Sequence, residues 1–173
     1  MNNKSIYLLI GQKGSGKSFI GAILDKEFGI KFIRVEDWAK QIKKDRDIDN
    51  DTYLKQVFAE IENGIRRALH ETDKLVFEST GLTEYFDAMF ENLRRDFHVT
   101  TIGVNVESNL CLERIKRRDQ TIHINVSDDQ VLMINNKVRE KNFKTDFTIN
   151  NENKTTQELV AELKEILSLS INK

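Results

Sequence analysis

The sequence predicts an α/β protein, a three-layer α/β/α sandwich in which helices cover both faces of a five-stranded parallel sheet. Short apolar runs alternate along the chain with longer segments of helical period. The first apolar run leads through a glycine-rich segment directly into an amphipathic helix. A length of 173 residues suits a single domain, so we expect residues 1–173 to fold around one sheet.

Each element is predicted from its own pattern of apolar residues. The five strands are short apolar runs: 5–10, 30–35, 74–78, 99–106 and 147–149. The seven helices have apolar residues every three or four positions: 17–28, 36–44, 52–69, 83–96, 108–119, 127–141 and 156–168. Ser127 is well placed to cap the helix that begins there. Strands that alternate with helices imply crossover connections, which produce a parallel sheet.

The composition excludes several classes of protein. One cysteine, Cys111, permits no disulfide framework and no four-cysteine zinc site. A formal net charge of −1 argues against an extended nucleic-acid surface. No apolar run approaches the roughly 18 residues of a membrane helix. We therefore expect a cytoplasmic protein without membrane contact, and a monomer or weak dimer.

A glycine-rich motif carries the strongest functional signal. The segment Gly11-Gln12-Lys13-Gly14-Ser15-Gly16-Lys17-Ser18 fits the phosphate-loop (P-loop) pattern G-x-x-x-x-G-K-[ST], and it lies between a strand and a helix. Its glycines let backbone N–H groups surround phosphate oxygens, and the helix N-terminus favours negative charge. Lys17 is expected to be catalytic at the β- and γ-phosphates, and Ser18 to coordinate Mg²⁺. The expected ATP-binding residues here are Gly11, Lys13, Gly14, Ser15, Gly16, Lys17, Ser18 and Phe19.

Two acidic residues follow predicted strands, where ligands bind in open parallel sheets. Asp37 is the candidate catalytic base, since a carboxylate there can accept the proton of a substrate hydroxyl. The alternative for Asp37 is helix capping, and its neighbour Glu36 is interpreted as a bystander. Glu78 is the candidate second metal residue beside Ser18. The alternative for Glu78 is a hydrogen bond to the loop that follows it.

Three arginines share one face of the predicted helix 108–119, because Arg114, Arg117 and Arg118 are spaced i, i+3 and i+4. Guanidinium groups stabilise the negative charge of a transferring phosphoryl group. We therefore assign all three to nucleotide binding and Arg118 also to catalysis. The alternative is a solvated face with i,i+4 ion pairs.

These features together resemble the P-loop kinases of the nucleoside-monophosphate kinase and shikimate kinase group. The resemblance implies a P-loop NTPase fold with strand order 2-3-1-4-5. It also implies a lid at about 117–127 and a substrate-side helical region at about 37–72. The pairing of Asp37 with Glu78-Ser79-Thr80-Gly81 resembles polynucleotide kinases and zeta-toxin-like small kinases more closely.

The chain departs from the named substrate signatures of that group. It contains no proline, so the G-x-P-R segment of adenylate kinases is replaced by Gly81-Leu82-Thr83-Glu84. Val126 stands where adenylate kinases carry an arginine before the acid pair of the lid. The D-x-D and glycine triplet of shikimate kinase are absent as well.

The function predicted from these residues is an ATP- and Mg²⁺-dependent phosphotransferase. It would move the γ-phosphate to a hydroxyl or phosphate of a small-molecule or nucleotide acceptor. Two alternatives remain open on the sequence: a nucleotide-dependent hydrolase or switch, and a nucleotide-binding module without catalysis. Against the switch, the N-K-x-D motif of GTPases is absent, and against the module, Lys17 and Ser18 are both intact.

Overall fold

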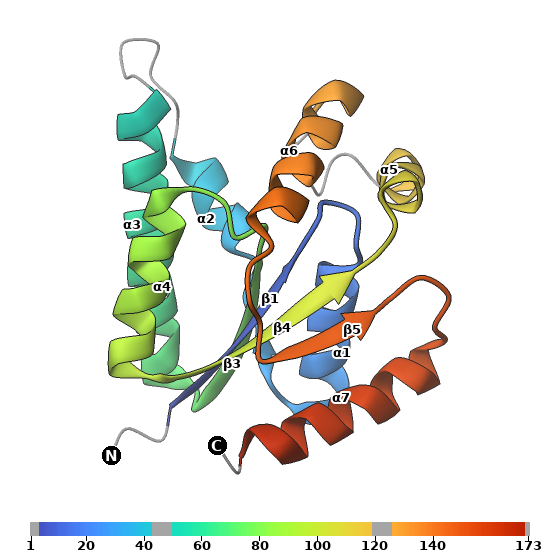
Figure 1. Cartoon of the computed structure of the whole chain (residues 1–173). Helices are drawn as coiled ribbons and strands as arrows, with labels where there is room; N and C mark the ends of the chain where they lie inside the picture. Colours follow the sequence, from blue (N-terminus) through green and yellow to red (C-terminus); the bar gives the residue numbers. More distant parts are fainter. Residues whose placement is uncertain (1–3, 43–49, 119–125, 172–173) are drawn as a thin grey trace.

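The computed structural model describes residues 4–42, 50–118 and 126–171. Five parallel strands form one sheet in the order β2-β3-β1-β4-β5 (Figure 1). The strands are β1 (Ser5–Gly11), β2 (Lys31–Phe32), β3 (Lys74–Ser79), β4 (His98–Asn105) and β5 (Phe147–Asn150). The helices are α1 (Lys17–Phe28), α2 (Val35–Gln41), α3 (Asn50–Glu71), α4 (Glu84–Asp96), α5 (Ser108–Arg117), α6 (Asp128–Lys141) and α7 (Thr156–Ser170). The fold class and strand order expected from the sequence are confirmed.

Helices cover the sheet on both faces, with α3 and α4 on one side and α1 and α7 on the other (Figure 1). Successive side chains of a strand point to opposite faces, so β1 contributes to two cores. Its Ile6, Leu8 and Ile10 join the cluster beneath α3 and α4. Its Tyr7 and Leu9 join the cluster beneath α1 and α7. Among the described helices, none has the length and apolar character needed to cross a bilayer.

The second strand is shorter than the sequence predicts. The expected strand 30–35 is wrong at both ends, because β2 covers Lys31–Phe32 and Val35 begins α2. This strand lies at the sheet edge and has only β3 as a neighbour. After a last backbone hydrogen bond from Ile33 to Val76, the chain turns so that Val35 enters the core as the first helical residue. The turn places α2 directly above the carboxyl edge of the sheet.

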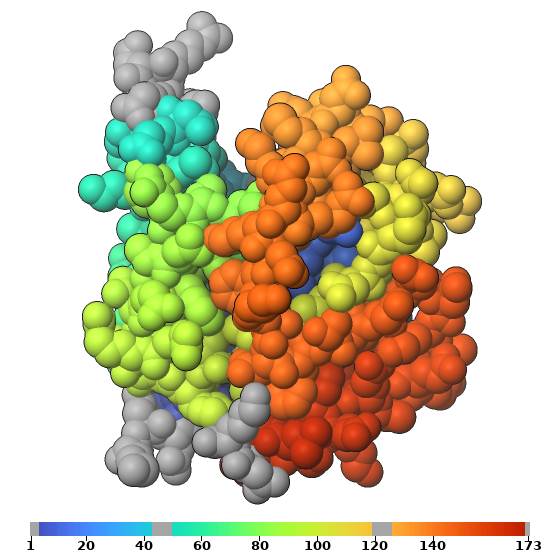
Figure 2. Space-filling model, in the orientation of Figure 1, coloured from blue at the N-terminus to red at the C-terminus, as the bar shows by residue number. Residues whose placement is uncertain are grey.

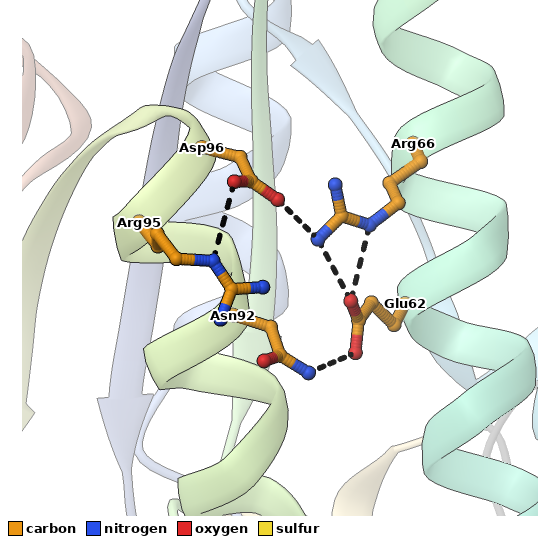
Figure 3. A network of polar contacts seen from close by, with 5 residues as sticks. All are labelled: Glu62, Arg66, Asn92, Arg95 and Asp96. Carbon is orange, nitrogen blue, oxygen red and sulfur yellow. Dashed lines mark hydrogen bonds and ion pairs between the residues drawn. The ribbon is translucent and has the colours of Figure 1, made fainter.

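A polar network joins α3 to α4 (Figure 3). Arg66 of α3 contacts Glu62 on its own helix and Asp96 of α4, each at 2.8 Å. Asn92 of α4 donates a hydrogen bond of 3.1 Å to Glu62. The hydrogen bond from Arg66 holds the pKa of Asp96 below its usual value. The two helices are thus joined by directed contacts beside their shared apolar core.

Helix α2 rests on α3 through one close contact. The Trp38 ring of α2 packs over Gly64, where an added Cβ would lie 2.6 Å from the ring. Only glycine permits this approach. Because α3 is held by α4, the contact fixes the position of α2 and of the acidic residues in its first turn.

Candidate active site

The strand register brings the predicted site segments to one edge of the sheet. Ile10 at the end of β1 pairs with Ser79 at the end of β3, and Gly11 pairs with Val104 near the end of β4. The P-loop, residues 11–18, begins at this edge, where the central strand β1 ends. The segment 78–81 leaves it from the adjacent strand, so the two segments lie side by side.

Two P-loop glycines have conformations that a side chain would disturb. Gly14 and Gly16 have φ values of 82° and 94°, in the left-handed region. A Cβ at Gly14 would lie 2.3 Å from the backbone oxygen of Cys111. A Cβ at Gly16 would lie 2.3 Å from Nδ2 of Asn151. The loop is therefore packed directly against α5 and the segment after β5.

Three carboxamide side chains form hydrogen bonds that connect the P-loop to the neighbouring segments. Gln12 of the loop donates to the Val106 carbonyl at 3.0 Å. Asn135 of α6 accepts from the Lys13 N–H at 2.8 Å and donates to the Lys13 carbonyl at 3.1 Å. Asn151 donates to the Ser15 carbonyl at 2.9 Å. Figure 2 shows the orange surface of α6 beside a hollow in which residues from the blue, N-terminal part of the chain are visible.

Sequence reasoning missed Asn135 and Asn151. Asn135 is 1 % exposed and lies on the buried side of α6 with Val131. The sequence did carry a signal for Asn135, because a carboxamide on the apolar side of a helix must find hydrogen-bond partners when it is buried. Asn151 follows β5 directly, and nothing in its local sequence indicates that it reaches the P-loop.

Replacing Asn135 with alanine is expected to weaken ATP binding three- to tenfold. It is also expected to lower the free energy of unfolding by about 1–3 kcal/mol, because the buried Asn135 side chain loses two hydrogen bonds to Lys13. Titration calorimetry with Mg·ATP and urea unfolding measure the two effects. The matched control is Asn136→Ala on the exposed side of the same helix, which should change neither. A destabilised Asn135→Ala variant with wild-type ATP affinity would show that Asn135 serves only the fold.

A cleft of about 310 Å³ lies beside the P-loop. Most sequence-predicted site residues reach it. Its lining residues are Lys13, Gly14, Gly16, Lys17, Ser18, Phe19, Glu36, Glu78, Ser79, Thr80, Arg114 and Arg118. Of the predicted residues, Gly11, Ser15, Asp37 and Arg117 do not line it.

Ser18 and Glu78 form a paired oxygen site within the cleft. The Ser18 hydroxyl donates to Glu78 and lies 2.8 and 2.9 Å from its two carboxylate oxygens. One hydroxyl and one carboxylate are hard oxygen ligands of the kind that Mg²⁺ prefers, with phosphate oxygens and water completing its shell. The pair fits the role expected from the sequence.

Three of the cationic side chains that line the cleft, Lys13, Lys17 and Arg118, are partly or wholly withdrawn from water. Lys17 donates to the carbonyls of Gly11 at 3.0 Å and Gln12 at 2.7 Å. Burial lowers the pKa of Lys17, and the nearby Glu78 carboxylate partly opposes this effect. Burial likewise lowers the pKa of Lys13 and of Arg118, and Glu36 is the main opposing charge for both. An anionic ligand would favour the charged form of all three groups.

The two neighbouring acids of α2 point to different environments. Glu36 lines the cleft, and its Oε2 atom is buried. The Asp37 side chain is 58 % exposed, and its Oδ2 lies 4.0 Å from Nε of Arg34 outside the cleft. The structure therefore brings Glu36, the residue interpreted as a bystander, to the phosphate-binding edge, and leaves the expected base Asp37 at the surface.

The three arginines at the C-terminal end of α5 also lie in different environments. Arg118 lines the cleft, whereas Arg117 is exposed. Arg114 lines the cleft and also donates to the carbonyls of Asn151 at 2.8 Å and Glu152 at 3.0 Å. Most of the lid expected at about 117–127 lies outside the described residues, as does the part of the substrate-side region between 43 and 49.

Comparison with known families identifies a match over most of the chain. The sequence model of the AAA domain family matches residues 6–141, which include the P-loop, Glu36, Glu78 and the arginines of α5. No curated protein sequence matches the chain.

Solved structures share the whole fold at low sequence identity. Shikimate kinase from Bacteroides thetaiotaomicron is 16 % identical with a TM-score of 0.63, over 95 % of this chain and 98 % of its own. APS kinase from Mycobacterium tuberculosis, in complex with AMPPNP and APS, is 12 % identical with a TM-score of 0.62, over 95 % and 98 %. A gluconokinase from Sinorhizobium meliloti is 16 % identical with a TM-score of 0.60, over 97 % of both chains. These neighbours are P-loop kinases, and the likeness establishes the shared fold.

Proposed function

Because this chain belongs to the AAA domain family and has the fold of small P-loop kinases, we propose that it is an ATP- and Mg²⁺-dependent phosphotransferase. It moves the γ-phosphate of ATP to a small-molecule or nucleotide acceptor. One observation supports this most strongly: a metal-type pair, Ser18 and Glu78, lies in the same cleft as a second carboxylate, Glu36, and the buried Lys17.

The nucleotide is held by the P-loop in this proposal. Backbone N–H groups of residues 14–18, in the P-loop and the first turn of α1, bind the phosphates, and Lys17 neutralises the β- and γ-phosphates. Arg118 adds charge at the transferred group, and Arg114 reaches the cleft beside Gly16. Ser18 and Glu78 would hold Mg²⁺, which neutralises charge on the phosphate oxygens.

We assign the catalytic base to Glu36 in place of Asp37, because only Glu36 lines the cleft. An acceptor oxygen forms a bond to the γ-phosphorus while the bond from that phosphorus to the β–γ bridging oxygen breaks. The proton of the acceptor hydroxyl passes to a Glu36 carboxylate oxygen, and ADP leaves. Lys17 and Arg118 stabilise the negative charge during transfer.

The solved neighbours support the general class. Those compared above are named as kinases for three different acceptors, and one holds AMPPNP and APS together. An arrangement that accommodates both a triphosphate analogue and a second compound is compatible with a two-substrate reaction here.

The test is an assay of ADP formation with Mg·ATP and a panel of polyols, amino sugars, nucleosides and nucleoside monophosphates. We expect a rate that depends on the acceptor and that disappears when Mg²⁺ is removed. Glu78→Gln should weaken the dependence of ATP binding on Mg²⁺, because one charged ligand is lost. ADP release at one rate regardless of acceptor would contradict phosphotransfer and favour hydrolysis.

A further inference from the structure

We propose that the protein has a second small-molecule site, separate from the cleft, for a compound that bears a phosphate or carboxylate group. The site is a pocket of about 380 Å³ between the end of β4, the last turn of α6 and the linker from α6 to β5. It shares no described lining residue with the cleft beside the P-loop. The hollow beside α6 in Figure 2 shows this side of the molecule. The inference goes beyond the proposed function, because this pocket takes no part in phosphoryl transfer.

The charge of the second pocket is entirely positive among its described lining residues. Arg139 in the last turn of α6 and Lys144 in the linker both line it, and no acidic residue does. Lys144 forms no hydrogen bond or ion pair in the part of the chain that the structure describes. Arg139 donates to the amide oxygen of Asn136 on its own helix, and this neutral partner leaves its charge uncompensated. Two cations at one pocket favour an anionic occupant.

The acidic residues nearest in sequence are directed elsewhere. Asp146 accepts hydrogen bonds of 2.8 Å from the backbone N–H and the hydroxyl of Thr101. Glu107 caps α5 and accepts from two backbone N–H groups of its first turn. Glu140, beside Arg139, is exposed and does not line the pocket. An anion in the pocket would therefore meet cations without a lining carboxylate to repel it.

Neutral polar side chains supply further hydrogen-bonding groups. Asn105, Asn142, Thr145 and Thr148 line the pocket. Their side chains form no hydrogen bonds with the described residues. Amide and hydroxyl donors can bind the oxygen atoms of a phosphate or carboxylate beside the two cations. The pocket thus offers both charge and donors to a small polar anion.

The walls of the pocket are held in place without a ligand. Gln12, at its floor, donates to the Val106 carbonyl at 3.0 Å and accepts from the Ser108 hydroxyl at 2.9 Å. Phe143, on another side, packs edge-on against Phe86 and Phe90. A pocket with fixed walls loses little conformational entropy when a ligand binds, as is usual for small-molecule sites.

The test is an NMR titration of protein saturated with Mg·AMPPNP, which occupies the P-loop up to the γ-phosphate position. Glycerophosphate probes the phosphate class, succinate probes the carboxylate class, and glycerol is the uncharged control. At least one of the two anions should bind with a dissociation constant below about 10 mM, and glycerol should not. The amide signals that shift should be those of residues 103–105 and 138–148. The anion that binds more tightly identifies the chemical class of the ligand.

Three variants locate the binding. Lys144→Gln and Arg139→Gln should each weaken it by about fivefold or more, since each removes a charged contact. Lys137→Gln is the matched control, because this exposed lysine of α6 does not line the pocket, and it should leave anion binding unchanged. All three variants should keep the wild-type affinity for Mg·AMPPNP and the wild-type midpoint of urea unfolding.

The outcomes separate this site from the proposed function. The second site would be overturned if neither anion bound, if the shifts were confined to residues of the cleft, or if Lys137→Gln weakened binding as much as Lys144→Gln. An absence of AMPPNP binding would contradict the proposed function alone. The same titration of nucleotide-free protein would then test the pocket through the same amide signals and variants.

Discussion

Replacing Glu36 with glutamine is expected to lower the rate of phosphoryl transfer by about 10²–10⁴-fold, the usual contribution of a general base. Glutamine keeps the size of the side chain but cannot accept the proton of the acceptor hydroxyl. Affinity for Mg·ATP should stay within about threefold, because the P-loop contacts are untouched. The measurement is kcat with a saturating acceptor, compared with the ATP dissociation constant from calorimetry.

Asp37→Asn is the matched comparison for this experiment. Asp37 is exposed and near Arg34, so its replacement should change kcat by less than about threefold. A large loss of kcat in Asp37→Asn with a small one in Glu36→Gln would return the base to Asp37. The pair of variants therefore decides between the position indicated by sequence and the position indicated by the structure.

Replacing Gly14 with alanine should abolish ATP binding and lower the free energy of unfolding by about 2–5 kcal/mol. Two costs act together at this position. Alanine is disfavoured at a φ of 82°, and its Cβ would overlap the Cys111 backbone oxygen at 2.3 Å. Relief of that overlap must displace either α5 or the P-loop, and the P-loop N–H groups would then no longer converge on phosphate.

Gly29→Ala separates the two costs. Gly29 ends α1 with a φ of 64°, and an added Cβ there would meet no atom within 4 Å. This variant should lose only about 1–2 kcal/mol of stability and should bind ATP normally. Urea unfolding measures the loss of stability, and calorimetry measures the affinity for ATP. If Gly14→Ala behaves like Gly29→Ala in both, the close packing of the P-loop on α5 does not matter for binding.

The fold could be predicted because its signals are local and agree with one another. Strong helical periods, such as that of residues 52–69, and a strand-loop-helix P-loop motif indicated strands that alternate with helices, and therefore a parallel sheet with helices on both faces. The confirmed strand order came from family resemblance, since pairing between distant strands has no local signal. The strand at 30–35 was overestimated because a sequence pattern does not tell a short edge strand from a longer one.

The site could be predicted only as far as the P-loop and its immediate chemistry allow. Whether Glu36 or Asp37 points into the cleft depends on the residue at which α2 begins. Each step along a helix rotates the side-chain direction by about 100°. The predicted start at Glu36 was one residue late, which left this direction undetermined. Asn135 was missed because its partner, Lys13, is 122 positions away in the chain.

The most direct measurement of the proposed activity is the fate of the γ-phosphate, followed by ³¹P NMR in a reaction with Mg·ATP and an acceptor that increases ADP formation in the panel assay. Each ADP formed should be matched by one new phosphate monoester on the acceptor, with orthophosphate a minor product. The same yield of ADP with and without acceptor, matched by orthophosphate, would contradict the assignment of this chain as a kinase.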